Sequence, residues 1–243
     1  MAIGGGEIRT LETYAIDARI VELAGKKNPT ALFIPTASGD SEGYWEAFRA
    51  VYGNKLGCHT QALFLMRDGP SRASIQDMIL NADLVYVGGG NTLRLMRIWR
   101  RHGVDTLLKK AAQNGVVLSG VSAGAMCWFE YGNRLPPSVD ETDVGAYVRL
   151  RGLGLMNALF CPHYNSEPRK RSLAAMVSKY GGMGLGVDDN AALEIAGDTY
   201  RVLSSAEGAG VHRVFRQRGR VIAEVVEPTE MYQPIERLLE TSA

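Results

Sequence analysis

The chain has 243 residues, of which 46% are hydrophobic, and a formal net charge of +1. A nearly neutral chain gives no general electrostatic reason to expect nucleic acid or a membrane surface as a partner. Its apolar runs are far shorter than the roughly 20 residues that span a bilayer, and its first residues lack the features of a signal peptide. The three cysteines show no CxxC spacing, which argues against a disulfide framework and a zinc site. We therefore expect a cytoplasmic protein without a metal or other cofactor.

Strands and helices are predicted to alternate through the first half of the chain, after a very short strand that ends in the glycine run at 4–6. The further predicted strands cover residues 30–34, 60–65, 83–87 and 116–118, and the predicted helices cover 13–24, 44–56, 71–80, 92–101 and 104–114. This alternation is typical of βαβ units, so we expect an α/β fold with a mostly parallel sheet and helices on both faces. A single domain over residues 1–243 is the simplest organisation.

The second half of the chain changes character. Residues 130–151 contain a polar, proline-bearing and aperiodic segment, which predicts a surface loop or lid. A strand over 158–161, a helix over 167–180 and a strand over 184–187 are expected to follow. Four further short strands are then predicted, separated by Gly-Asp and Arg-Gly turns, at 191–195, 200–203, 211–216 and 221–226. These strands would form a C-terminal β-hairpin region.

Residues 116–129 contain the motif on which the functional prediction depends. The segment Gly120-Val-Ser-Ala-Gly124 fits G-x-S-x-G, follows an apolar strand and precedes an apolar run over 125–129 that is compatible with a helix. A strand, a tight turn and a helix are the setting in which a serine becomes a nucleophile. The alternative is a plain Gly/Ser turn, because five-residue patterns recur by chance.

A serine nucleophile needs a base and a group that orients the base. Of the four histidines, His163 is the best placed, because it directly follows an apolar strand. In a parallel sheet, binding and catalytic sites form at the carboxyl ends of the strands. Asp188 and Asp189 follow the next predicted strand, and either carboxylate could orient the imidazole. A polar turn is the alternative role for this Asp-Asp-Asn segment.

The segment Gly88-Gly-Gly-Asn91 also follows a predicted strand, and three interpretations are open. It could bind a phosphate at a helix N-terminus, form a tight turn, or present a backbone N–H group to an oxyanion together with Ala123. The phosphate interpretation is weakened because G-x-G-x-x-G is incomplete and a Walker lysine is missing.

Three segments, Gly88-Gly-Gly-Asn-Thr92, Gly120-Val-Ser-Ala-Gly-Ala125 and Pro162-His163, resemble peptidase family S51 in their order and spacing. This family contains dipeptidase E, which is an α-aspartyl dipeptidase, and the cyanophycinases. The resemblance implies a flavodoxin-like sheet related to class I glutamine amidotransferases, with a serine in place of their cysteine. It covers most of the chain, from Leu32 to about Leu193.

The resemblance also implies roles for individual residues. Ser122 matches the family nucleophile, His163 the general base, and Asp189 the acid of the triad. Gly90 and Ala123 match the oxyanion donors. Two further residues match substrate-binding positions, Asn91 and Arg169. Arg169 would recognise the side chain of a substrate aspartate.

We therefore expect a serine peptidase that hydrolyses short peptides, with Asp-Xaa dipeptides as candidate substrates and a homodimer as the assembly to consider. One alternative is an α/β-hydrolase esterase, in which Ser122 would work with His212 and an acid such as Asp143 or Asp188. The other is a non-catalytic metabolite-binding domain that uses the glycine loops.

Overall fold

The computed structural model describes residues 1–66 and 69–240, and the chain divides into two compact units. The first unit contains Met1 and Glu7–Gly124, and the second contains Ala2–Gly6 and the chain from Ala125 onward. Whether residues 1–243 act as one domain stays a prediction. Every helix within the described residues is too short or too polar to cross a bilayer.

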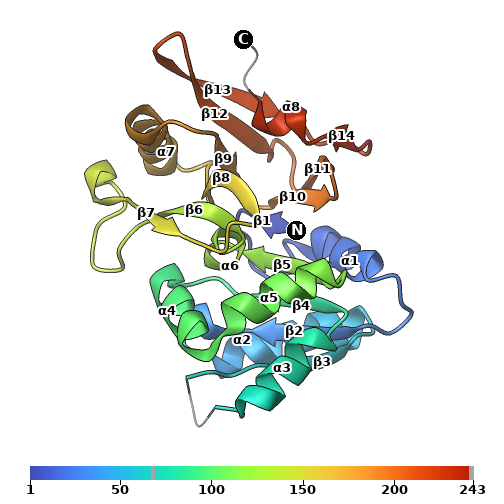
Figure 1. Ribbon diagram of the computed structural model, residues 1–243. Helices are drawn as coiled ribbons and strands as arrows, with labels where there is room; N and C mark the ends of the chain where they lie inside the picture. The colour runs from blue at the N-terminus through green and yellow to red at the C-terminus, as the bar shows by residue number, and fades with distance from the viewer. Residues whose placement is uncertain (67–68, 241–243) are drawn as a thin grey trace. The chain divides into compact units, whose positions relative to one another are not determined.

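The first unit is built on four parallel strands. They pair in the order β5 (Val117–Val121), β4 (Leu84–Val87), β2 (Thr30–Ile34) and β3 (His59–Ala62). Its helices are α1 (Tyr14–Leu23), η1 (Thr36–Ser38), α2 (Glu42–Phe48), the π-helical turn η2 (Arg49–Lys55), α3 (Arg72–Leu80), α4 (Thr92–His102) and α5 (Val104–Gln113). Figure 1 shows α3 and α5 side by side over one face of this sheet. The predicted βαβ alternation is confirmed.

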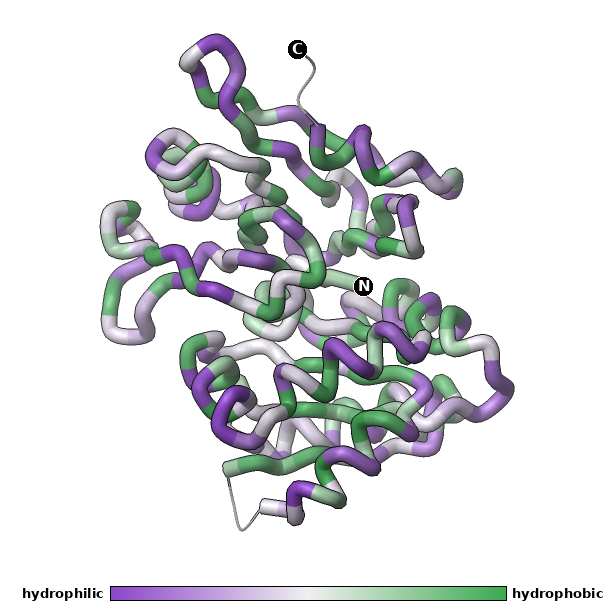
Figure 2. The backbone as a smooth tube through the Cα atoms, in the orientation of Figure 1, coloured by the Kyte–Doolittle hydropathy of each residue, from purple (hydrophilic) through white to green (hydrophobic). Residues whose placement is uncertain are grey.

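The core on the other face of this sheet is aromatic. Phe33 of β2 stacks on Phe48 of α2 with ring centroids 4.7 Å apart, and Phe48 stacks in turn on Tyr52 of η2 at 4.3 Å. Tyr86 of β4 packs edge-on against Tyr52 at 5.4 Å. These four side chains are fully buried or nearly so, and each aromatic ring removes on the order of 150–250 Å² from water. Figure 2 shows hydrophobic residues concentrated along the strands of this unit.

A buried carboxyl group lies beside this aromatic core. Asp17 of α1 accepts hydrogen bonds from the Thr13 hydroxyl at 2.8 Å and from the Tyr52 hydroxyl at 2.8 Å. Its side chain is completely shielded from solvent. Burial raises the pKa of Asp17 to about 6, because removal from water disfavours the charged form more than the two hydrogen bonds favour it.

We expect Asp17 to make the protein less stable as the pH rises. The pKa of Asp17 is higher in the folded chain than in the unfolded chain, so folding binds a proton between about pH 4 and pH 6, and the free energy of unfolding falls across that range. The loss is up to about 3 kcal/mol, at about 1.4 kcal/mol per pKa unit. Urea unfolding of wild type and Asp17→Asn at pH 4.5 and pH 7 measures it. A difference between the two proteins that does not change with pH would contradict this expectation.

The second unit contains the remaining strands in two groups. One group is ordered β13 (Arg220–Val226), β12 (Val211–Gln217), β9 (Gly184–Val187), β8 (Met156–Cys161), β6 (Phe129–Arg134) and β7 (Val148–Arg151). The other is ordered β14 (Gln233–Pro234), β11 (Thr199–Ser204), β10 (Ala191–Ala196) and β1 (Ala2–Ile3). Helices α7 (Glu167–Tyr180) and α8 (Glu236–Leu239) complete the unit. The predicted C-terminal hairpins are confirmed as the antiparallel pairs β10–β11 and β12–β13, and with them the α/β fold class.

Two local predictions were wrong in this part of the chain. The apolar run 125–129 does not continue as a helix, because α6 (Ala123–Met126) ends after one turn and Phe129 begins β6. The carbonyl of Cys127 instead accepts a hydrogen bond from the backbone N–H of Leu153 at 2.7 Å. A hydrogen bond to a distant segment thus overrides the local helical preference.

The second correction concerns residues 130–151, which were predicted to be a loop. Strands β6 and β7 pair antiparallel there, with Asn133 opposite Arg149, and irregular structure is confined to 135–147, including the short helix η3 (Val144–Ala146). Asn133 is fully buried and donates a hydrogen bond to Ser172 Oγ of α7 at 3.0 Å. The polar, proline-bearing residues 136–143 do lie in this irregular part, so the loop prediction fails only for the two strands that flank it.

Candidate active site

Ser122 lies in a strained turn between β5 and α6 in the first unit. Its φ is 53°, in the left-handed region that few residues other than glycine adopt. Gly124, the last glycine of the motif, is required by close packing: a Cβ atom there would lie 2.1 Å from the carbonyl oxygen of Val87. The turn therefore has the tight strand-to-helix geometry that the G-x-S-x-G pattern predicts.

The glycine segment Gly88–Asn91 lies beside this turn at the end of β4. A Cβ atom on Gly89 would lie 3.6 Å from Ser122 Cβ, and Gly90 has a φ of 136°. The Asn91 side chain accepts a hydrogen bond from the backbone N–H of Arg94 at 3.1 Å and caps α4. The segment is therefore a tight strand-to-helix turn that brings backbone close to Ser122.

His163 and Asp189 form a hydrogen-bonded dyad in the second unit. His163 follows β8 with a φ of 54°, Asp189 follows β9, and Nδ1 of the imidazole lies 2.6 Å from Oδ1 of the carboxylate. The hydrogen bond from His163 holds the pKa of Asp189 below its usual range, and a hydrogen bond between the Asp189 and Asn165 side chains adds to the effect. The dyad is part-exposed, with 36% and 37% of the two side chains accessible, so it can meet a ligand.

Arg169, the predicted substrate-binding arginine, lies near this dyad in the first turn of α7. Its Nη1 donates to the Asn133 carbonyl at 3.0 Å, and its guanidinium carbon lies 5.0 Å from the centre of the Tyr147 ring. The positive charge of Arg169 also contributes to the lowered pKa of Asp189. The arginine is thus held in place by protein contacts while its charge still reaches the acid of the dyad.

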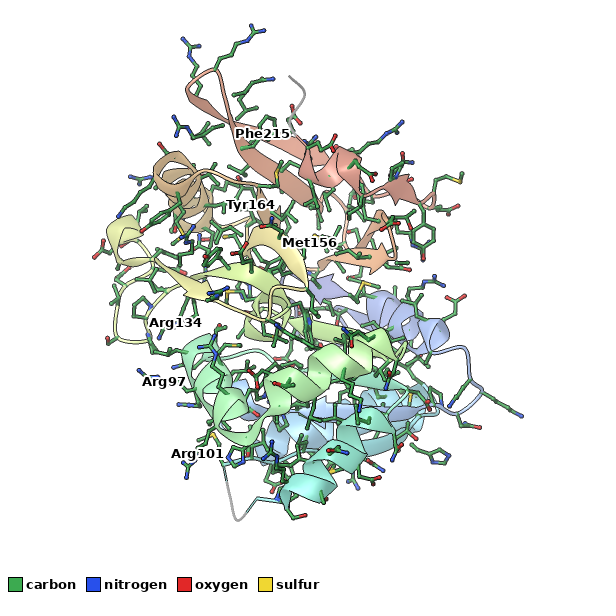
Figure 3. The ribbon with its side chains drawn as sticks, in the orientation of Figure 1. Arg97, Arg101, Arg134, Met156, Tyr164 and Phe215 are labelled. Carbon is green, nitrogen blue, oxygen red and sulfur yellow. The ribbon has the colours of Figure 1, made fainter. Side chains whose placement is uncertain are left out.

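A second histidine–aspartate pair lies deeper in the same unit. His212 Nε2 is 2.9 Å from Asp188 Oδ2, which also accepts a hydrogen bond from the Gly210 N–H at 3.1 Å. The ring of Tyr164, labelled in Figure 3, packs against the His212 ring with centroids 4.7 Å apart. Only 18% of the His212 side chain and 8% of the Asp188 side chain are exposed, so burial favours a structural role for this pair.

The three cysteine side chains are buried and free, and their environment does not activate them. Burial raises the pKa of Cys58 to about 11 and that of Cys161 to about 12, and it raises the pKa of Cys127 well above its ordinary value. Such thiols stay protonated at neutral pH, and only the thiolate is a good nucleophile. Among the candidate nucleophiles, the geometry therefore favours Ser122.

Comparison with known proteins places the chain in a family. The model of peptidase family S51 matches residues 1–203 of the 243. The chain belongs to this family. This S51 member is therefore a peptidase, as the arrangement of its motifs predicts, and the α/β-hydrolase alternative is disfavoured.

Relatives agree with this assignment, and a solved structure has the same fold. The peptidase is 35% identical over 231 residues to the uncharacterized peptidase YgaJ of Bacillus subtilis, covering 93% of this chain and 95% of that one. It is 27% identical over 178 residues to a Streptomyces coelicolor protein named peptidase E, with 68% of each chain covered. Its fold matches the crystal structure of a peptidase from an acI-B1 Actinobacterium with a TM-score of 0.73 at 21% identity, over 96% of this chain and 94% of that one.

The sequence predicted the two members of the dyad of this S51 peptidase and the arginine near it, but it missed other contacts of the dyad. The Asn165 side chain accepts a hydrogen bond from the Asp189 N–H at 3.2 Å, and Gly5 packs directly against the dyad. Asn165 lies two residues after His163 and could have been noticed; the role of Gly5 depends on pairing across the whole chain. Within the described residues, no cluster of three or more His, Cys, Asp or Glu side chains could hold a metal ion.

Proposed function

We propose that this S51 peptidase is a serine hydrolase of short peptides, with Ser122 as nucleophile, His163 as general base and Asp189 as the residue that orients the base. The observation that carries the proposal is the left-handed backbone of Ser122, which places a half-buried serine at a tight strand-to-helix turn. The hydrogen bond of 2.6 Å between His163 and Asp189 supports it, because it supplies the oriented imidazole that a serine requires.

In the proposed reaction, His163 Nε2 takes the proton from the Ser122 hydroxyl as Oγ attacks the carbonyl carbon of the scissile peptide bond. Asp189 accepts the hydrogen bond from Nδ1, fixes the tautomer and stabilises the imidazolium that forms. The imidazolium then gives its proton to the leaving amine, and an acyl-enzyme remains on Ser122. A water molecule, activated by the same imidazole, hydrolyses the acyl-enzyme and restores the serine.

The oxyanion of the tetrahedral intermediate would be stabilised by the backbone N–H groups of Gly90 and Ala123. Gly89 approaches Ser122 closely, and Ala123 directly follows the nucleophile, which supports this assignment. One such donor lowers the barrier by roughly 3 kcal/mol in other serine hydrolases. Asn91, at the start of α4, is proposed to contact the bound peptide.

We further propose that Arg169 recognises an acidic side chain of the substrate, so that Asp-Xaa dipeptides are preferred. The Nη1 contact with Asn133 uses part of a guanidinium that carries five N–H donors, and planar pairing with a carboxylate is the interaction that arginine makes best. The effect of its charge on Asp189 supports a position near the reacting groups.

For this specificity we expect Arg169→Gln to lose activity selectively on acidic substrates. Removing a charged hydrogen-bond partner costs about 1.5–3 kcal/mol, which is roughly a 10- to 150-fold loss in kcat/KM for Asp-Xaa dipeptides. Neutral dipeptides should change by less than about 3-fold, because they gain nothing from the guanidinium charge. A panel of Asp-Xaa, Xaa-Asp and neutral dipeptides measures both quantities.

Arg149→Gln is the matched control, because Arg149 also stacks on tyrosine, with its guanidinium carbon 3.9 Å from the Tyr131 ring centre. It should leave the substrate profile unchanged. A uniform loss across the panel in Arg169→Gln would contradict the specificity role, and a wild-type enzyme that cleaves none of these dipeptides would contradict the proposed substrate class.

A further inference from the structure

The N-terminal segment Ala2–Gly6 belongs to the unit that carries His163 and Asp189, although the residues that follow it belong to the other unit. Strand β1 pairs antiparallel with β10, with Ile3 opposite Ala192. Beyond the strand, the Gly4 N–H donates to the Ala191 carbonyl and the Asn190 N–H donates to the Gly5 carbonyl, each at 3.0 Å. The segment therefore holds the turn that presents Asp189.

Neither Gly4 nor Gly5 has a left-handed φ, so backbone conformation does not require glycine at these positions. Glycine is required there because neighbouring atoms leave no space for a Cβ atom. The two positions differ in what an added methyl group would meet. At Gly4, a Cβ atom would lie 2.2 Å from the Asp188 carbonyl oxygen, which is backbone. At Gly5, it would lie 1.8 Å from Asp189 Oδ1 and 2.5 Å from His163 Nδ1, which are both side-chain atoms.

The two atoms that a side chain at position 5 would displace are the two atoms of the dyad hydrogen bond. Both belong to side chains that are more than one third exposed and can turn toward solvent. The fold can therefore accommodate a small side chain at this position by moving them, and the displacement falls on the contact between imidazole and carboxylate.

We propose that Gly5 is a positioning residue for the reaction: by lacking a side chain, it reserves the space in which the Asp189 carboxylate meets the His163 ring. This inference rests on the proposed function, because it assigns Gly5 a role in orienting the proposed base. It makes the N-terminal glycine segment a part of the active site, although Gly5 is 158 residues from His163.

The test is Gly5→Ala in the full chain, with kcat and KM measured on a dipeptide that wild type cleaves. We expect kcat to fall about 100-fold or more, because misplacement of a catalytic group by about 1 Å has this effect, while KM changes by less than about 3-fold. Gly53→Ala is the control: its φ is not left-handed, its Cβ would meet nothing closer than 3.5 Å, and it should retain wild-type kcat. Wild-type kcat in Gly5→Ala would overturn the proposal.

A double-mutant cycle separates this role from a general structural one. Asp189→Ala removes the nearer of the two groups that Gly5 makes room for, the His163 ring being the other. Adding Gly5→Ala to it should therefore lower kcat far less than the roughly 100-fold loss expected in wild type, since mutations that act through one contact are not additive. An equal loss in both backgrounds would overturn the proposal. If Gly5→Ala alone fails to fold, the double variant should fold, because the nearer clashing group, the carboxylate, is gone and the part-exposed His163 ring can turn toward solvent; failure of the double variant to fold would also overturn the proposal.

Nuclear magnetic resonance of the histidine rings makes the test independent of turnover. In ¹⁵N-histidine-labelled wild type, His163 should show a protonated Nδ1 bonded to Asp189, assigned by its loss in His163→Gln. Gly5→Ala should lose this low-field proton, and Gly53→Ala should keep it. If no peptide is hydrolysed, the proposed function fails while this measurement still decides the role of Gly5; an unchanged Nδ1 signal in Gly5→Ala overturns the positioning role.

Discussion

Ser122→Ala should abolish peptide hydrolysis without unfolding the protein. Removal of Oγ removes the atom that forms the acyl-enzyme, and loss of a triad nucleophile lowers kcat by about 10⁶-fold in serine peptidases whose three residues act as a unit. Alanine meets the same steric cost as serine at a φ of 53°, so the turn should keep its conformation. Steady-state hydrolysis of dipeptides and covalent labelling by a serine-reactive phosphonate measure the result.

Ser119→Ala is the matched control, because Ser119 is a buried serine in β5, the strand that leads into the turn at Ser122. Its hydroxyl donates to the Val85 carbonyl at 2.8 Å, so its removal should cost about 1 kcal/mol of stability and leave labelling at Ser122 intact. If Ser122→Ala retains wild-type activity on every peptide that wild type cleaves, the serine mechanism is wrong.

His163→Ala should have the next largest effect. General acid–base catalysis by a positioned histidine contributes about 10²- to 10⁴-fold to a rate, and this variant should lose turnover and phosphonate labelling together, since Ser122 then has no base. The Asp189 carboxylate would also lose the hydrogen bond that contributes most to its lowered pKa. Rates of labelling and of hydrolysis are compared with those of wild type.

His212→Gln is the control for this experiment. Its amide nitrogen can still donate to the Asp188 carboxylate, so the buried pair keeps a hydrogen bond while the imidazole is lost. We expect kcat within about 5-fold of wild type, because this pair is buried and structural. If instead His212→Gln were inactive and His163→Ala active, the esterase-type arrangement of Ser122 with His212 and Asp188 would replace the proposed triad.

Local sequence signals predicted the elements whose ends are marked by their own residues. Helix α7 was predicted over Glu167–Tyr180, with Pro168 in its first turn and Gly181 directly after it, and the structure has these bounds. Strand β9 was likewise predicted over Gly184–Val187. The turn at Ser122 is also local, since its glycines and serine lie within five consecutive residues. In all three cases the chain carries the start and stop signals itself.

Predictions failed where the partner of a segment is distant in sequence. The run 125–129 has a helical composition, but carbonyl groups of Cys127 and Trp128 accept hydrogen bonds from the segment 153–156. Residues 130–151 were predicted to be a loop from the polar composition of 136–143, but the ends of the segment form β6 and β7, and β6 also pairs with the distant strand β8. Tertiary hydrogen bonds to buried polar groups decide such segments, because an unpaired buried group costs about 1–3 kcal/mol.

By itself, the sequence determined the strand-to-helix turn at Ser122, the strand ends that carry His163 and Asp189, and membership of peptidase family S51. Only the tertiary structure decided which histidine each of the two neighbouring aspartates contacts. Asp189 Oδ1 lies 2.6 Å from His163 Nδ1, while Asp188 Oδ2 lies 2.9 Å from His212 Nε2 in a more buried position. It also decided that the Gly5 backbone stands against the dyad. The reason is that motifs and propensities are read along the chain, whereas burial and free space depend on segments that folding brings together.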